Sequence, residues 1–391
     1  MRNAVIGLVI GIVAGIVLGT SVIAPRIKHL DEAAPVPAEN AEAPAPVEGT
    51  VDNAATVPPP TVTEVESVRP KDVLRLRMAS AFPENLPLYG TAAKRLERSV
   101  WRISDGTFEL RFHPPGALVG RDEALKALAS GAIDAAFAPA DDLAALEPAL
   151  ALFGGPPMGA SVEAYLGWMS GGGGRTLMED ILGEMKLQGL LCGIVPNGAG
   201  GRFSAALTIV DDLKGRRIRA DGLTAALYKR LGAETVDLSI ADAVAEMEAG
   251  TLYGAQISTP HVDATLGMPL NGAVYYVPGW RTPATAFVLI MAIEKWDGLG
   301  AVQQTRLRSA CAENVLLGVS GTEALQFEAL KKIVRAGADV RPWPAEIEAA
   351  MREAWKAEAT EQRKKNPLFD RVLASYARFV KGQSIWEELA R

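Results

Sequence analysis

The sequence predicts an α/β protein whose folded part consists of two lobes with a cleft between them. This fold class follows from two stretches that each read as strand, helix, strand, helix and strand. The first stretch spans residues 72–138, and the second spans residues 203–257. Units of this βαβαβ type place their strands in a parallel sheet and bind ligands at the carboxyl ends of those strands. The sequence therefore predicts a site in the cleft between the two units.

The first unit shows the two periodicities that distinguish strands from helices. Apolar residues alternate with arginines at positions 74–78, as in a strand, and recur at helical spacing at positions 92–103. A turn at Asp105 and Gly106 precedes a strand at 108–112. A helix at 122–129 and a strand at 132–138 complete the unit.

The second unit places an arginine where a strand gives way to a helix. This residue, Arg219, stands just before Asp221 and Gly222. The elements that follow are expected in this order: a helix at 223–231, a strand at 235–238, a helix that starts at Ser239 with the spacing of a capping box, and a strand ending near Gln256. A residue at the end of a strand in such a unit is expected to face the cleft.

The segments outside the two units are mainly helical. Four glycines at 171–174 precede Arg175 without the ending of a phosphate-binding loop, so we interpret them as a turn between helices. An apolar strand is expected at 286–293, and helices are expected at 322–336 and 344–359. The tail at 369–389 has the spacing of an amphipathic helix that packs on a lobe or on another subunit.

The amino-terminal region predicts a membrane segment and a linker. Residues 4–24 carry no charge and are long enough for a transmembrane helix, which favours an uncleaved anchor over a cleaved signal. Glycines recur every fourth residue from Gly7 to Gly19, which either permits close helix packing in lipid or reflects their frequency in membrane helices. Residues 31–70, rich in proline, alanine and acidic residues, are expected to be a disordered linker.

Composition also narrows the classes of function and of binding site that this chain can have. The net charge of −6 gives no basic footprint for nucleic acid. Cys192 and Cys311 are far apart in sequence, which excludes a CxxC motif. They could pair in an oxidising compartment, but two buried free thiols are the favoured interpretation. Three scattered histidines indicate no histidine-based metal site.

At this point the sequence resembles a known family. Residues 210–219, VDDLKGRRIR, resemble the DLKGxKxR signature of the periplasmic solute-binding proteins of tripartite ATP-independent periplasmic (TRAP) transporters. Further similar segments occur in order: SAFPENLPLYG, SDGTFELRFHPPGALVG, ALKALASGAIDAAF, MEAGTLYGAQ and YYVPGW. The similarity covers about residues 72–391 and is closest to the subgroup that binds 2-oxo acids such as pyruvate, or related hydroxy acids.

The resemblance implies a two-lobed periplasmic-binding-protein fold that closes by a hinge over a small carboxylate. The expected boundaries are 72–196 plus about 258–285 for lobe I, 197–257 plus about 286–345 for lobe II, and 346–391 for the C-terminal helices. The family's carboxylate-binding arginine corresponds to Arg219, whose planar guanidinium matches a carboxylate. Its alternative role is an ion pair with a neighbouring aspartate. The remaining ligand-binding residues expected are Phe82, Asp141, Asn197, Gln256 and Trp280.

The sequence departs from the subgroup where that subgroup binds a metal ion with its substrate. The resemblance places a Glu-Trp pair at Gln256-Ile257, and the shortened segment 196–203 holds no glutamine. Losing a negative charge weakens a site for a hard cation, so no metal cofactor is expected. The family's tyrosines after the third strand become Asp141 and Asp142. Asp141 could supply a substitute carboxylate, or both residues could cap the following helix.

The leading function is therefore a periplasmic solute-binding protein, tethered to the inner membrane, that delivers an organic acid to a TRAP permease. The alternative is a degenerate, membrane-anchored binding fold that acts as a sensor or partner-binding module. An enzyme is a third class, but no nucleophile–base pair supports it. A homodimer is possible through the C-terminal helices or the glycine series.

Overall fold

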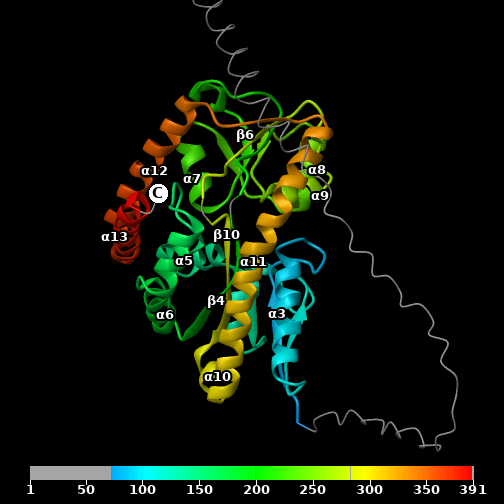
Figure 1. The fold of residues 1–391 in the computed structure, drawn as a ribbon, viewed down its shortest axis with the longest axis vertical. Coiled ribbons are helices and arrows are strands. Elements are labelled where there is room, and N and C mark those ends of the chain that lie inside the picture. The colour runs from blue at the N-terminus through cyan, green and yellow to red at the C-terminus, as the bar shows by residue number, and fades with distance from the viewer. Residues whose placement is uncertain (1–71, 197, 282, 390–391) are drawn as a thin grey trace, which may run out of the picture. The chain divides into compact units, whose positions relative to one another are not determined.

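The computed structural model describes residues 72–196, 198–281 and 283–389. The predicted anchor at 4–24 and linker at 31–70 lie outside the described residues. Among the helices within those ranges, none has the length and apolar character needed to cross a membrane. The described chain forms two mixed sheets, each covered by helices on both faces (Figure 1).

The first lobe is built on a five-stranded sheet with the order β2-β1-β3-β10-β4. β1, β2 and β3 are parallel, as the first βαβαβ unit predicts, whereas β10 runs antiparallel to both of its neighbours. The strands are β1 (Leu74–Ser80), β2 (Phe108–His113), β3 (Ala135–Pro139), β4 (Leu187–Val195) and β10 (Thr285–Ala292).

β10 lies in the interior of this lobe, with both of its faces buried. Ala286, Val288 and Ile290 enter one apolar cluster, whereas Phe287 and Leu289 enter the other. This period of two explains why the strand reads as a continuous apolar run. The helices of the lobe are α3 (Gly90–Ile103), α4 (Ala124–Ala129), α5 (Val162–Ser170), α6 (Gly174–Glu184) and α10 (Ile293–Asp297), with 3-10 turns at Arg121–Glu123, Ala140–Ala145 and Pro148–Gly154. Of the four glycines at 171–174, the three at 171–173 form the predicted turn between α5 and α6, and Gly174 begins α6.

The second lobe is built on a six-stranded sheet with the order β11-β9-β5-β8-β6-β7. β6, β7 and β8 are parallel and form the predicted βαβαβ unit with α7 and α8. The elements are β5 (Gly201–Phe203), a 3-10 turn (Val210–Leu213), β6 (Arg217–Arg219), α7 (Gly222–Arg230), β7 (Glu234–Val236), α8 (Ile240–Glu248), β8 (Gly254–Ala255), α9 (Pro260–Thr265), β9 (Val274–Tyr276) and β11 (Asp339–Arg341). Ser239 caps α8 by accepting a hydrogen bond from the backbone N–H of Asp242, as the sequence predicts.

The chain passes between the lobes differently from the expected boundaries. We expected residues 258–285 in lobe I and 286–345 in lobe II. Instead, β9 pairs with β5 and β11 in the second sheet, and β10 pairs with β3 and β4 in the first. The second crossing therefore lies between β9 and β10. The sequence shows the turn between these two strands. It does not show which strands they pair with, because that pairing is set by the tertiary fold.

Helix α11 (Ala301–Arg335) connects the two lobes along its length. It packs on β4 and α3 in the first lobe and on α9 in the second (Figure 1). The contact with β4 is so close that a Cβ added at Gly318 would lie 2.3 Å from the carbonyl oxygen of Ile194. This glycine therefore sets the distance between helix and sheet.

A disulfide joins α11 to β4, which corrects the expectation of two free thiols. Cys192 and Cys311 are bonded, and both lie in the core of the first lobe. The sequence could not show this pairing because the two cysteines are 119 residues apart and meet only through helix packing. A structural disulfide is typical of an oxidising, extracytoplasmic compartment.

The two C-terminal helices pack on different lobes. α12 (Ala345–Lys365) contacts α7, and α13 (Pro367–Leu389) contacts α5 and α6. Phe369, Val372 and Tyr376 are buried in the first-lobe core. The amphipathic tail thus packs on a lobe, as its spacing predicts, whereas the side chain of Trp386 remains exposed.

Replacing Gly318 with alanine should destabilise the fold by about 1–3 kcal/mol, because the new methyl group meets backbone that cannot move away cheaply. Equilibrium urea unfolding measures the change. Gly321 is a matched control in the same helix, since a Cβ there meets nothing within 4 Å. Gly321→Ala should gain up to about 1 kcal/mol from helix propensity. Equal gains for both variants would contradict the close contact.

Replacing both cysteines with alanine should lower the free energy of unfolding by about 2–5 kcal/mol, because the bond constrains a long loop in the unfolded chain. Reductant should bring the parent protein towards the variant in the same measurement. Thiol labelling of the unfolded, unreduced protein should find neither cysteine free. Full labelling of both residues would show that the pair does not form.

Candidate functional site

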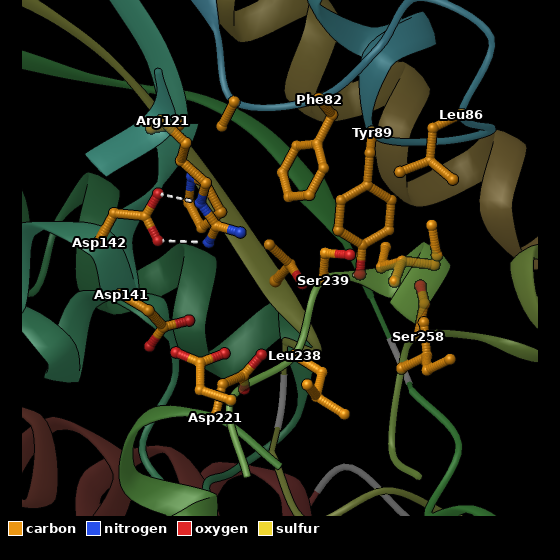
Figure 2. A pocket seen from close by; sticks show the side chains of 18 of the residues that line it. Phe82, Leu86, Tyr89, Arg121, Asp141, Asp142, Asp221, Leu238, Ser239 and Ser258 are labelled. Atoms are coloured by element: carbon orange, nitrogen blue, oxygen red, sulfur yellow. Dashed lines mark hydrogen bonds and ion pairs between the residues drawn. The ribbon is translucent and has the colours of Figure 1, made fainter. Parts of the chain in front are cut away.

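A cavity of about 1430 Å³ lies between the two lobes. Aromatic and aliphatic side chains of the first lobe cover one side, and acidic side chains from both lobes lie across from them (Figure 2). The first side includes Phe82, Leu86 and Tyr89. The ring of Phe82 packs edge-on against Tyr89, with 4.8 Å between the centroids. The cavity is therefore apolar at one wall and strongly charged at the other.

Arg219 is placed by the register of the second sheet. It is the last residue of β6, which lies between β8 and β7 and runs parallel to both. Parallel strands end at the same edge, so the chain leaving β7 and β8 flanks the guanidinium. Nε of Arg219 donates to the carbonyl oxygen of Leu238 at 3.2 Å, and Nη1 donates to that of Gln256 at 2.7 Å. The sheet edge thus fixes the orientation of the side chain.

The third contact of Arg219 is an ion pair with Asp221, at 3.1 Å from Nη2. The arginine side chain is 8% exposed, whereas the side chain of Asp221, which also lines the cavity, is 47% exposed. Burial would raise the pKa of Asp221, but Arg219, Arg281 and Arg121 outweigh it and hold the pKa below its ordinary value. Asp221 is therefore ionised at neutral pH and accessible from the cavity.

A second ion pair involves the predicted residue Asp141. Its Oδ1 accepts from Nη1 of Arg281 at 2.8 Å, and both side chains are largely buried. Burial raises the pKa of Asp141, and Arg281 offsets this only in part. Neither Asp141 nor Asp142 caps the 3-10 turn that they open, so the capping interpretation is wrong. Both carboxylates are used by arginines instead.

The third ion pair joins Arg121 and Asp142. Nε and Nη2 of Arg121 donate to the two carboxylate oxygens at 2.8 and 2.6 Å (Figure 2). The guanidinium also lies over the ring of Phe82, 5.2 Å from its centroid. This contact connects the apolar wall to the charged one.

One buried polar group at the cavity wall lacks a hydrogen-bond partner, the Oε1 of Gln256. Gln256 and Ser258 follow β8 and line the cavity. The hydroxyl of Tyr89 bonds Thr285 at 3.1 Å and also interacts with Ser258. Buried polar groups are normally paired, so Oε1 of Gln256 is an acceptor that a ligand reaching it could use.

The structure brings four predicted site residues together at the cavity: Phe82, Asp141, Arg219 and Gln256. Trp280 lies elsewhere, because it is buried in the second-lobe core. Its Nε1 donates to the hydroxyl of Tyr228 at 2.9 Å, and its ring packs on Trp343. Asn197 lies outside the described residues.

Three of the charged residues that form the ion pairs of the cavity were not predicted as site residues from the sequence. Arg281 follows the PGW turn that carries part of the resemblance, so its place in the chain was a usable signal. Arg121 pairs with a residue 21 positions away, and only the fold brings the two together. Asp221 entered the sequence analysis only as a neighbouring ion-pair partner for Arg219.

The residues present do not fit a metal ion like the one the subgroup uses. Within the described ranges, no group of three or more histidine, cysteine, aspartate or glutamate side chains is arranged to hold an ion. The cavity aspartates nearest to Arg219 and Arg281 face guanidinium groups, which compete with a cation. Gln256 offers a neutral oxygen where the resemblance places a carboxylate.

The chain is similar in sequence and fold to known periplasmic binding proteins. A curated monocarboxylate 2-oxoacid-binding periplasmic protein of Nostoc sp. (strain PCC 7120) is 24% identical over 316 residues, which cover 81% of this chain and 86% of the relative. A solved TRAP transporter solute-binding protein from Bordetella bronchiseptica RB50, with copurified calcium and picolinate, is 25% identical with a TM-score of 0.77. That similarity covers 82% of this chain and 95% of the other.

A second solved structure shows the same fold. It is a TRAP periplasmic solute-binding protein from Colwellia psychrerythraea with bound calcium and pyruvate, 21% identical, with a TM-score of 0.75 over 81% of this chain and 97% of the other. The profile of the bacterial extracellular solute-binding proteins, family 7, matches residues 78–366. This match covers most of the chain, including both sheets and the cavity between them. The protein therefore belongs to family 7 of the bacterial extracellular solute-binding proteins.

Proposed function

We propose that this protein is the solute-binding component of a TRAP transporter and binds a small organic acid between its lobes. Family membership supports the transport role, and it favours this role over the alternative of a degenerate sensor. Relatives of the same fold hold pyruvate, picolinate or malonate. The family is one of binding proteins rather than enzymes.

The observation that carries the proposal is the state of Arg219. A guanidinium has five N–H bonds, of which two donate to backbone carbonyls and a third faces Asp221. One N–H therefore remains on each terminal nitrogen. A carboxylate can accept both in the planar fork geometry that arginine offers. Because the group is buried and fixed, little conformational entropy is lost on binding.

Closure of the lobes completes the proposed mechanism. The cavity is larger than the roughly 300–1,000 Å³ of typical ligand pockets, so a small acid would fill it only after the lobes approach each other. The connections between β4 and β5 and between β9 and β10 are the places where a hinge would act. Phe82 and Tyr89 would then cover the apolar part of the ligand, and Asp141 would lie beside it.

The remaining parts of the proposal concern location and partners. A periplasmic position agrees with the family and with the disulfide. The uncharged run at 4–24 supports tethering to the inner membrane by a helix. The ligand would be delivered to TRAP permease subunits, and the exposed end of α13 offers a surface for a homodimer.

Arg219→Ala should weaken acid binding by at least about 30-fold, or about 2 kcal/mol, because it removes the fork and leaves Asp221 uncompensated. Isothermal titration of the full-length protein with a panel of small carboxylates measures this. Arg219→Lys should bind with intermediate affinity, since it keeps the charge but not the fork.

Arg75→Ala is the matched control, because this arginine on β1 is exposed and pairs with Glu109 on β2. It should bind the same acid as the parent protein does. Unchanged affinity in Arg219→Ala, with a titratable acid in hand, would refute the role of Arg219.

A further inference from the structure

The charges of the cavity do not suit a simple anion. Three guanidinium groups line it, and each is already paired with an aspartate. Six carboxyl side chains line the same cavity, from Asp122, Asp141, Asp142, Asp221, Asp237 and Glu248. A carboxylate bound at Arg219 would therefore add negative charge to a site that has an excess of it. Like charges in close contact are unfavourable unless a cation joins them.

Asp221 is the acid that would feel this charge most. It contacts the guanidinium that would hold the carboxylate, and almost half of its side-chain surface is open. Its lowered pKa keeps it ionised. A ligand that carries a positive group next to its carboxylate would convert this repulsion into an attraction.

An unpartnered atom beside Arg219 has a related requirement. The amide oxygen of Gln256 accepts hydrogen bonds only, and it is buried at the cavity wall without a donor. This atom is independent of the acidic excess, and an N–H or O–H donor on a ligand would satisfy it.

A metal ion is another cation that could meet the acidic excess, and relatives that hold pyruvate or picolinate also hold calcium. The donor set described above does not fit that solution, because the acids nearest to the arginines are engaged by them. An ammonium group on the ligand needs no such set, since it is compact and carries three donors.

We propose that the ligand is a zwitterionic acid with an amino group beside its carboxylate, such as a 2-amino acid, rather than a 2-oxo acid. The carboxylate binds Arg219, and the ammonium group lies against Asp221 and donates to the amide oxygen of Gln256. This inference rests on the proposed function, because it needs Arg219 to hold the carboxylate. The apolar wall of Phe82, Leu86 and Tyr89 would receive the side chain of the acid.

The test compares acids that share a carbon skeleton. The full-length protein is titrated calorimetrically with alanine, pyruvate and lactate, and with leucine and 4-methyl-2-oxopentanoate, in EDTA and then with calcium. The amino acid should bind at least about tenfold more tightly than the 2-oxo acid of the same skeleton, without calcium. Tighter binding of the 2-oxo acids, calcium-dependent binding, or no binding of any amino acid would overturn the inference.

Asp221→Asn tests the assigned contact directly. The side chain of Asp221 makes no capping hydrogen bond to α7, so the amide should leave the helix intact, and thermal unfolding checks this. Amino-acid binding should weaken at least about tenfold, whereas 2-oxo acids should bind as well as before or better, because Arg219 becomes less neutralised. Asp211→Asn makes the same charge change on the surface, beside Lys214, and should alter neither affinity.

The outcomes separate this inference from the proposed function. If 2-oxo acids bind more tightly than amino acids and Arg219→Ala abolishes that binding, the solute-binding role stands and the zwitterion is wrong. If an amino acid binds but Asp221→Asn binds it equally well, the assigned contact is wrong. If binding is insensitive to Arg219→Ala, both proposals fail.

Discussion

Pairing of buried guanidinium groups is the constraint on which this site depends. An arginine cannot shed its charge when it leaves water, so each one at the cavity needs a carboxylate or carbonyl oxygens. Arg219 receives both, from Asp221 and from the chain that leaves β7 and β8. Arg281 receives Asp141 and the carbonyl oxygen of Ala284. Asp141, which departs from the pattern that the resemblance implies, is thus the partner of a buried arginine.

The scaffold holds these pairs by joining the lobes at several places. α11 packs on both lobes, and the disulfide and Gly318 fix it to β4. The chain also crosses between the lobes near the cavity, at the connections between β4 and β5 and between β9 and β10. The pair between Arg281 and Asp141 lies at one of these crossings, since Arg281 stands between β9 and β10. One of the ion pairs of the site is therefore formed by a residue on the segment that carries the chain from one lobe to the other.

The sequence predicts the fold better than it predicts the site, for physical reasons. Strand and helix periods are local, so both βαβαβ units and the position of Arg219 at the end of β6 could be predicted. The assignment of β9 to the second sheet and of β10 to the first depends on long-range pairing. The contact of Cys192 with Cys311 depends on long-range packing in the same way. Arg281 meets Asp141 across 140 residues, which no local pattern shows. Trp280 is part of the PGW motif, but its indole packs on Trp343 in the core of the second lobe.

A protein can keep the fold of its family and bind a different ligand when the difference between the two sites is one of charge. The sheet edge needs only backbone carbonyls to orient Arg219, so this part of the site survives any substitution that keeps the register. The residues around it set what else the ligand must carry. Replacing a metal-binding carboxylate by Gln256 removes one requirement, and placing Asp221 against the arginine adds another. Under the proposed zwitterionic ligand, the positive charge next to the bound carboxylate comes from the ligand itself.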